Sequence, residues 1–210
     1  IEAEGGGAFG KRIEAYARHH EMNADDLEMG IIVAPPNFML KEDIAELVKA
    51  VTAAGGASVI MVDTYAQVTP GANENAGEDM GLALANARAL AEATGALVIL
   101  VHHSGKDAHR GSRGWSGIKA AADVEIEVVR HENGQREIRI TKMKDGDDGL
   151  SWGFALAIVE VGIDDDGEAI TSCVAIEAEL PKPEADDKPR KGVKKLGLVE
   201  THIVETIEAA

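Results

Sequence analysis

The sequence predicts an α/β fold: a parallel core sheet flanked by helices and extended by antiparallel strands on its C-terminal side. Two observations support this prediction. In the first half of the chain, wholly apolar strand-like runs alternate with amphipathic segments, which indicates a parallel sheet covered by helices on both faces. After about residue 123, apolar and polar residues alternate one by one, as they do in antiparallel sheets with one solvated face.

The first half supplies the elements of the parallel core in the order that such a fold needs. Apolar residues recur at helical spacing, which predicts helices at 8–20, 41–54 and 78–94. A short aliphatic run follows each helix, which predicts strands at 30–34, 58–62 and 97–101. Pro35 and Pro36 end the first of these strands, and Gly55 and Gly56 end the second helix.

The second half predicts two antiparallel pairs. The first pair comprises 124–129 and 136–142 around a turn at 132–134. The second pair comprises 154–163 and 169–177 around a turn at 164–167.

The predicted domain organisation follows from a change of composition near residue 181. Residues 1–180 are expected to form one core. Residues 181–195 combine three prolines with mixed charge, which is typical of a solvated linker, and 196–210 read as the start of a further helical domain, for example a winged helix. Because the chain begins in a predicted strand and stops in a predicted helix, we expect it to be a fragment of a longer protein.

Composition limits the classes of function. The 210 residues carry a formal net charge of −16, which argues against broad, non-specific binding of nucleic acid. Two basic islands, 106–119 and 130–144, could still meet phosphates locally, although solvated loops explain them equally well. No apolar run approaches the roughly 18 residues of a membrane span, and no secretory signal is evident. The single cysteine, Cys173, excludes an internal disulfide and suits a cytoplasmic protein.

Polar residues follow two of the predicted parallel strands at the point where each strand ends. Asp63 follows the strand at 58–62, and His102 with His103 follows the strand at 97–101. Ligands bind outside the carboxyl ends of strands in open parallel sheets, so this edge is the predicted site. A carboxylate there can hold Mg²⁺ through water beside a nucleotide, although an aspartate that only caps a turn is the alternative.

The two histidines cannot face the same way, because side chains alternate along a strand. One is therefore expected to point into the cleft, and the alternative is that both are structural. A competing hypothesis makes Asp63, His102 and His103 the metal ligands of a hydrolase, but no further ligand stands at a recognisable metal-site spacing.

The N-terminal stretch allows two interpretations. Gly5, Gly10 and Lys11 match the phosphate-binding loop consensus up to its last position, where Arg12 replaces the Ser or Thr that ligates Mg²⁺. Alternatively Glu4, at a predicted strand end, is the functional group, a carboxylate able to orient an attacking water. An exposed terminal acid is the simplest explanation of Glu4.

Lys142 and Lys144 lie on one side of a predicted strand. Two adjacent ammonium groups repel unless an anion meets them, which suggests a phosphate ligand. A solvated edge strand explains the pair equally well.

Five segments, taken in order, resemble the RecA-like ATPases of plasmid and phage replication, and most closely the RepA-type hexameric helicase group with its prophage relatives. They are AEGG at 3–6, VIMVDT at 59–64, LVILVHHSGKD at 97–107, RGSRGWSGIKAAAD at 110–123 and TKMKDGDDG at 141–149. The resemblance covers about residues 1–180 and implies a RecA-like fold with ATP and Mg²⁺ as ligands.

The resemblance also implies roles for the residues at the predicted edge. Glu4 matches the glutamate that activates the hydrolytic water, and Asp63 matches the aspartate that supports Mg²⁺. His103, together with Lys106, matches the residues that sense the γ-phosphate. Thr64 and His102 stand beside them as nucleotide-binding residues.

The remaining implied roles concern partners. Lys142 and Lys144 match paired lysines that reach the ATP site of a neighbouring subunit, which implies a homo-oligomeric ring, expected to be a hexamer. Residues 104–117 occupy the place of a loop that faces single-stranded DNA, so Arg110, Arg113 and, just beyond it, Lys119 become candidate DNA contacts.

One departure from the family pattern is serious. The family carries its phosphate-binding loop upstream of the Glu4 strand, and this sequence starts after that point. The match of Gly5 to Lys11 would then be coincidental, and this stretch alone is expected to be inactive. The expected function is that of a DNA-replication ATPase of helicase or translocase type; the alternatives are a non-catalytic RecA-like module that binds nucleic acid or a partner, and the metal-dependent hydrolase.

Overall fold

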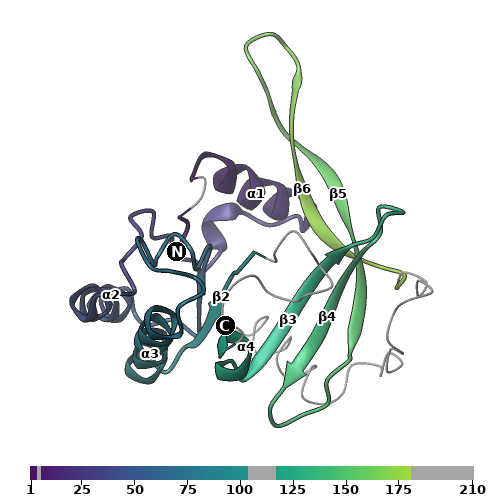
Figure 1. Cartoon of the computed structure of the whole chain (residues 1–210). Helices are drawn as coiled ribbons and strands as arrows, with labels where there is room; N and C mark the ends of the chain where they lie inside the picture. The colour runs from purple at the N-terminus through teal and green to yellow at the C-terminus, as the bar shows by residue number, and fades with distance from the viewer. Residues whose placement is uncertain (4–5, 104–116, 181–210) are drawn as a thin grey trace. The chain divides into compact units, whose positions relative to one another are not determined.

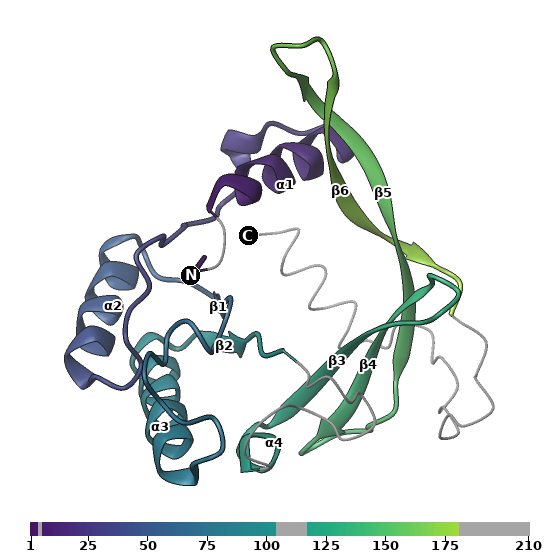
Figure 2. The same ribbon diagram turned by 45° about the horizontal axis from the view of Figure 1, so that its top comes forward.

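The structure of the protein is a computed structural model, which describes residues 1–3, 6–103 and 117–180 (Figure 1). It confirms the predicted α/β class, with a two-stranded parallel sheet and a four-stranded antiparallel sheet (Figure 2). The predicted linker and the predicted further domain, 181–195 and 196–210, lie outside the described residues.

The chain divides into two compact units. The first comprises residues 1–122 and 158–174, and the second comprises residues 123–157 and 175–210. The long strands β5 (Ser151–Ile163) and β6 (Ala169–Ala178) contribute to both units.

The first unit holds the parallel sheet and the helices around it. Its elements are α1 (Gly6–His19), the 3-10 helix η1 (Ala24–Asp26), α2 (Lys41–Ala53), β1 (Val59–Val62), α3 (Gly77–Thr94), β2 (Leu97–Leu100) and α4 (Gly117–Ala121). Strands β1 and β2 pair in parallel, from Val59 opposite Leu97 to Val62 opposite Leu100. The predicted helices and the last two predicted strands are therefore confirmed to within two residues at each end.

Among the helices that the structure describes, α2 and α3 cover one face of β1. Ile60 and Val62 are 6% and 0% exposed and join one apolar cluster with side chains of α2 and α3. Val59 and Met61 on the opposite face are 49% and 50% exposed. The prediction of a sheet covered on both faces is therefore wrong for this strand, because the helices that precede and follow it pack on the same side.

Helices α2 and α3 begin with the same polar arrangement. The Oδ2 of Asp43 accepts a hydrogen bond from the backbone N–H of Asn37 at 2.7 Å, and the Oδ2 of Asp79 accepts one from the N–H of Asn73 at 2.8 Å. Each asparagine Oδ1 accepts the N–H of the residue two positions on. A negative charge in the first turn also interacts favourably with the positive end of the helix dipole. These contacts therefore stabilise the start of both helices.

Residues 30–34 do not form the predicted strand. The carbonyl of Ile32 accepts one hydrogen bond from the N–H of Glu2 at 2.9 Å. Ile32 packs against the apolar core, whereas Ile31 and Val33 on either side of it are 45% and 68% exposed. The prediction is wrong because a strand needs a ladder of backbone hydrogen bonds as well as a half-buried face, and this run forms no such ladder with the residues that the structure describes.

The four-stranded sheet has the order β3-β4-β5-β6, with β3 at Val124–Arg130 and β4 at Arg136–Met143. Both predicted hairpins are confirmed. Their turns place Gly134 and Gly167 at φ +85°, a conformation that disfavours any residue with a Cβ. Figure 1 shows the four strands side by side.

A close backbone approach defines the sheet at Gly153 of β5. A Cβ at this position would lie 2.3 Å from the carbonyl oxygen of Glu179 and 2.7 Å from that of Ala178. Backbone cannot move aside as a flexible side chain can, so we expect Gly153→Ala to lower the free energy of unfolding by about 1–3 kcal/mol. Urea denaturation followed by circular dichroism measures this change.

Gly162 on the same strand provides the control, because a Cβ there would meet only the Cδ1 of Ile170, at 3.9 Å. We expect Gly162→Ala to leave the stability nearly unchanged. Equal stabilities for the two variants would contradict the close approach at Gly153.

Candidate functional site at the carboxyl edge of the parallel sheet

The carboxyl ends of β1 and β2 meet at one edge of the parallel sheet. The N–H of Val101 donates to the carbonyl of Val62 at 2.9 Å, and the N–H of Tyr65 donates to the carbonyl of Val101 at 2.8 Å. Asp63 follows β1 directly and His102 follows Val101. The structure therefore brings these two predicted site residues to the same edge.

The backbone of Asp63 is held on its other side by the first residues of the chain. Its N–H donates to the carbonyl of Ile1 at 3.0 Å, and its carbonyl accepts the N–H of Ala3 at 2.8 Å. These first residues run parallel to β1 and end at the same edge. Glu4 comes next in the chain but lies outside the described residues.

The two residues after Asp63 belong to the interior. Thr64 and Tyr65 are 1% and 2% exposed, and the peptide bond between Asp63 and Thr64 is cis. The Tyr65 hydroxyl donates to the carbonyl of Met80 at 3.3 Å. Burial raises the pKa of Tyr65 to about 12, so the hydroxyl stays protonated and anchors this turn to α3.

The imidazole of His102 has a defined hydrogen-bonding state. Its Nδ1 lies 2.9 Å from the carbonyl oxygen of His103. Because a carbonyl oxygen can only accept, Nδ1 donates this hydrogen bond and Nε2 is left for other partners. The ring also lies beside Tyr65, with 6.0 Å between the ring centroids.

The two histidines differ in exposure, since His102 is half-buried and His103 is exposed. This difference agrees with the expectation that they do not face the same way. Of the other residues predicted in this region, Lys106, Arg110 and Arg113 lie outside the described residues, whereas Lys119 is exposed on α4.

The donor chemistry at this edge fits a hydrated magnesium ion better than a zinc-type site. Mg²⁺ prefers oxygen ligands and keeps several waters, which suits the half-buried carboxylate of Asp63. Within the described ranges, no group of three or more His, Cys, Asp or Glu side chains could hold a metal ion. Asp63, His102 and His103 therefore do not form the ligand set that a metal-dependent hydrolase would need.

The near-match to a phosphate-binding loop is helical in this structure. Helix α1 begins at Gly6, so Gly10 and Lys11 lie within it. A phosphate-binding loop needs backbone N–H groups that are free to point at the phosphates, and N–H groups inside a helix bond to the preceding turn instead. The helical conformation of Gly10 and Lys11 therefore fits the interpretation that the match is coincidental.

A family model described as an AAA domain matches residues 1–109, which is just over half of the chain. The chain belongs to this family of P-loop ATPases. The matched region contains both strands of the parallel sheet and the edge with Asp63 and His102. No curated protein matches the chain. Among the helices that the structure describes, none is long and apolar enough to cross a membrane.

The paired lysines of this AAA protein face acidic residues on β3 or directly before it. Lys142 on β4 stands opposite Glu125 of β3 in the sheet register. The Nζ of Lys144 lies 3.2 Å from the Oδ1 of Asp123, and its N–H donates to the carbonyl of the same residue at 2.9 Å. The carboxylate of Asp123, in the same chain, therefore already pairs with the ammonium group of Lys144.

The second unit contains a buried polar cluster that the sequence did not predict. Glu137 on β4 is 0% exposed. Its carboxylate accepts hydrogen bonds from His131 at 3.0 Å and from Arg139 at 3.1 Å. Glu137 and Arg139 stand two residues apart on a strand and so share one face, which is the signal that could have indicated an ion pair.

The charge of Glu137 is stabilised by these neighbours. Burial alone would raise the pKa of Glu137, but the hydrogen bonds from Arg139 and His131, with Ser151 beside them, outweigh it and hold the pKa below its usual value. The carboxylate is therefore ionised at neutral pH, and the cluster is a structural ion pair of the antiparallel sheet.

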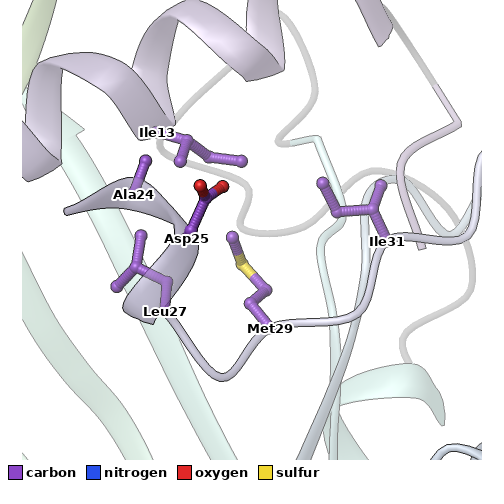
Figure 3. Close-up of a pocket in the computed structure, with 6 residues that line it drawn as sticks. All are labelled: Ile13, Ala24, Asp25, Leu27, Met29 and Ile31. Carbon is purple, nitrogen blue, oxygen red and sulfur yellow. The ribbon is translucent and has the colours of Figure 1, made fainter.

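A hollow of about 350 Å³ lies beside η1 in the first unit. Figure 3 shows its lining, in which the carboxylate of Asp25 points among mostly apolar side chains. The lining residues are Ile13, Ala24, Asp25, Leu27, Met29 and Ile31. None of them belongs to the edge with Asp63, so this hollow is separate from the candidate nucleotide site.

Proposed function

We propose that the protein is an ATPase that couples ATP hydrolysis to movement along, or remodelling of, DNA during replication in the cytoplasm. The observation that carries the proposal is the parallel pairing of β1 with β2, which brings Asp63 and His102 to one edge in a chain of the AAA family. Ligands of open parallel sheets bind at this kind of edge.

Each residue at the edge has a role that suits its chemistry. Asp63 would hold Mg²⁺ through water, and the ion would offset charge on the transferred phosphoryl group. Glu4 follows Ala3, whose N–H bonds to Asp63, and would orient the attacking water. His102 would accept a hydrogen bond at Nε2, and His103 with Lys106 would respond to the γ-phosphate.

Lys142 of β4 and Lys144, directly after that strand, would act across a subunit interface in a ring, which we propose to be hexameric. The ion pair between Lys144 and Asp123 would have to break before Lys144 could contact a phosphate. Both side chains of this pair are well exposed, at 65% and 69%. Exposed ion pairs contribute only about 0–1 kcal/mol, so a phosphate could displace the aspartate at little cost.

The proposed DNA contacts are local. The net charge of −16 disfavours a broad basic surface, so binding would rest on Arg110, Arg113 and Lys119 beside a single strand. A non-catalytic RecA-like module remains the competing function, and loss of turnover would distinguish it.

ATP hydrolysis by the full-length protein, with and without single-stranded DNA, tests the proposal through Glu4→Gln. We expect this variant to retain ATP binding and to lose at least about 100-fold in turnover, because an amide cannot accept the proton of the attacking water. Glu92→Gln, at an exposed position on α3, is the matched control. Undiminished DNA-stimulated hydrolysis by Glu4→Gln would refute the assigned role, and absence of hydrolysis in the wild type would favour the non-catalytic module.

A further inference from the structure

Helix α1 carries an exposed stripe of ring and cationic side chains that the proposed ATPase does not use. Arg12, Tyr16 and His19 follow one another at i, i+4 and i+7, and His20 stands beside them. All four are exposed, and Tyr16 is 43% exposed despite its large apolar ring. We call these four residues the α1 stripe.

The rings of the α1 stripe contact one another and form a continuous surface. The centroids of Tyr16 and His20 are 4.2 Å apart, with 42° between the ring planes. The centroids of His19 and His20 are 5.0 Å apart, edge to face. Exposed aromatic rings of this kind are the surfaces on which bases of single-stranded nucleic acids stack.

The charge on α1 itself is positive, whereas the segment that follows it is acidic, with Glu21, Asp25 and Asp26. Glu14, the one acid between Gly6 and His20, lies 2.6 Å from the Nε of Arg18 and is neutralised by it. No ion pair among residues that the structure describes engages Lys11 or Arg12. These two cations are therefore available to phosphates next to the rings.

The hollow beside η1 adjoins the stripe. Ile13, which lines the hollow, shares one helix face with Tyr16 and His20 at i+3 and i+7. A volume of about 350 Å³ falls in the range of small-molecule sites, and five of the six lining residues are of apolar type. The Asp25 carboxylate, seen among the lining side chains in Figure 3, would accept a hydrogen bond from an exocyclic amino group.

We infer that the α1 stripe and the hollow beside it bind single-stranded nucleic acid. A phosphate lies at Arg12, one base stacks on Tyr16 and His20, and the next base enters the hollow with its amino group on Asp25. Bases with an exocyclic amino group are therefore preferred over thymine, which has none. This site is distinct from the predicted loop at 104–117.

Fluorescence anisotropy of the full-length protein with labelled oligodeoxycytidylate of about 12 nucleotides tests the stacking. We expect Tyr16→Ala to weaken binding by about 5- to 150-fold, the loss of one stacked base, and Tyr16→Phe to bind like the wild type. Arg12→Ala should reduce the slope of log affinity against log salt by about one. Lys49→Ala, an exposed cation on α2, is the matched control and should change neither.

Comparison of oligodeoxycytidylate with oligothymidylate tests the hollow. The wild type should bind the cytosine oligomer at least about fivefold more tightly than the thymine oligomer. The Asp25→Ala variant should bind the two oligomers equally, even if its affinity for both changes. A matched RNA oligomer shows whether the sugar matters. Wild-type affinity in both Tyr16→Ala and Arg12→Ala, with binding lost in Arg113→Ala, would overturn this inference while leaving the ATPase proposal intact. Equal binding of the two oligomers by the wild type would overturn the assignment of the hollow.

Discussion

Asp63→Asn should lower Mg²⁺-dependent ATP hydrolysis by the full-length protein by about 100-fold or more, the loss typical of removing a group that stabilises transition-state charge. The amide has the shape of the carboxylate but not its negative charge, so it attracts a hydrated cation weakly. The backbone of Asp63 is held by Ile1 and Ala3, and Tyr65, two residues on, is held by Val101 directly after β2, so the edge should keep its shape.

The dependence on Mg²⁺ separates this explanation from a general loss of structure. We expect Asp63→Asn to need a higher concentration of Mg²⁺ for half-maximal activity, while its thermal unfolding matches that of the wild type. Asp166→Asn, in the exposed turn between β5 and β6, should change neither quantity. An Asp63→Asn enzyme with wild-type turnover and wild-type Mg²⁺ dependence would exclude Asp63 from the site.

Glu137→Gln should lower the free energy of unfolding by about 3–5 kcal/mol, as expected when one partner of a buried ion pair is removed. The substitution leaves His131 and Arg139 without the anion that they contact, and these side chains are only 6% and 23% exposed. Denaturation in urea at neutral pH measures the loss, with Glu177→Gln at an exposed position on β6 as the control.

The pH dependence of stability provides a second test of Glu137. Because its pKa is held below the ordinary value of 4.5, the carboxylate contributes stability above that pH and loses it as the pH falls toward and through the lowered pKa. The wild type should therefore lose more stability than Glu137→Gln between neutral and acid pH. Parallel stability curves for the two proteins would show that the cluster contributes nothing through its charge.

Local sequence pattern was sufficient for most of the fold. Glycines at the hairpin turns, together with the residue-by-residue alternation of apolar and polar side chains, predicted both antiparallel pairs. The aliphatic runs before Asp63 and His102 predicted two parallel strands, and parallel pairing brings their carboxyl ends to one edge. The co-location of these two site residues therefore follows from topology.

Features that depend on tertiary packing were not predictable in this way. The run at 30–34 has strand propensity but lies exposed, and α2 and α3 cover one face of β1 where two covered faces were expected. Glu137 alternates with apolar residues along β4, a pattern that by itself predicts a solvated position, and its burial follows from its contacts with His131 and Arg139. The α1 stripe likewise required the structure, since helical spacing alone does not tell an exposed face from a buried one.

Paramagnetic Mn²⁺, used in place of Mg²⁺ with ATP, would locate the metal and nucleotide through the amide resonances of the full-length protein. We expect Mn²⁺ with ATP first to broaden the resonances of Ala3, Asp63, Thr64 and His102, and to leave those of the hollow beside η1 sharp. Broadening centred on the acidic turn at 164–167, or spread evenly over the acidic surface, would contradict a nucleotide and magnesium site at the carboxyl edge of β1 and β2.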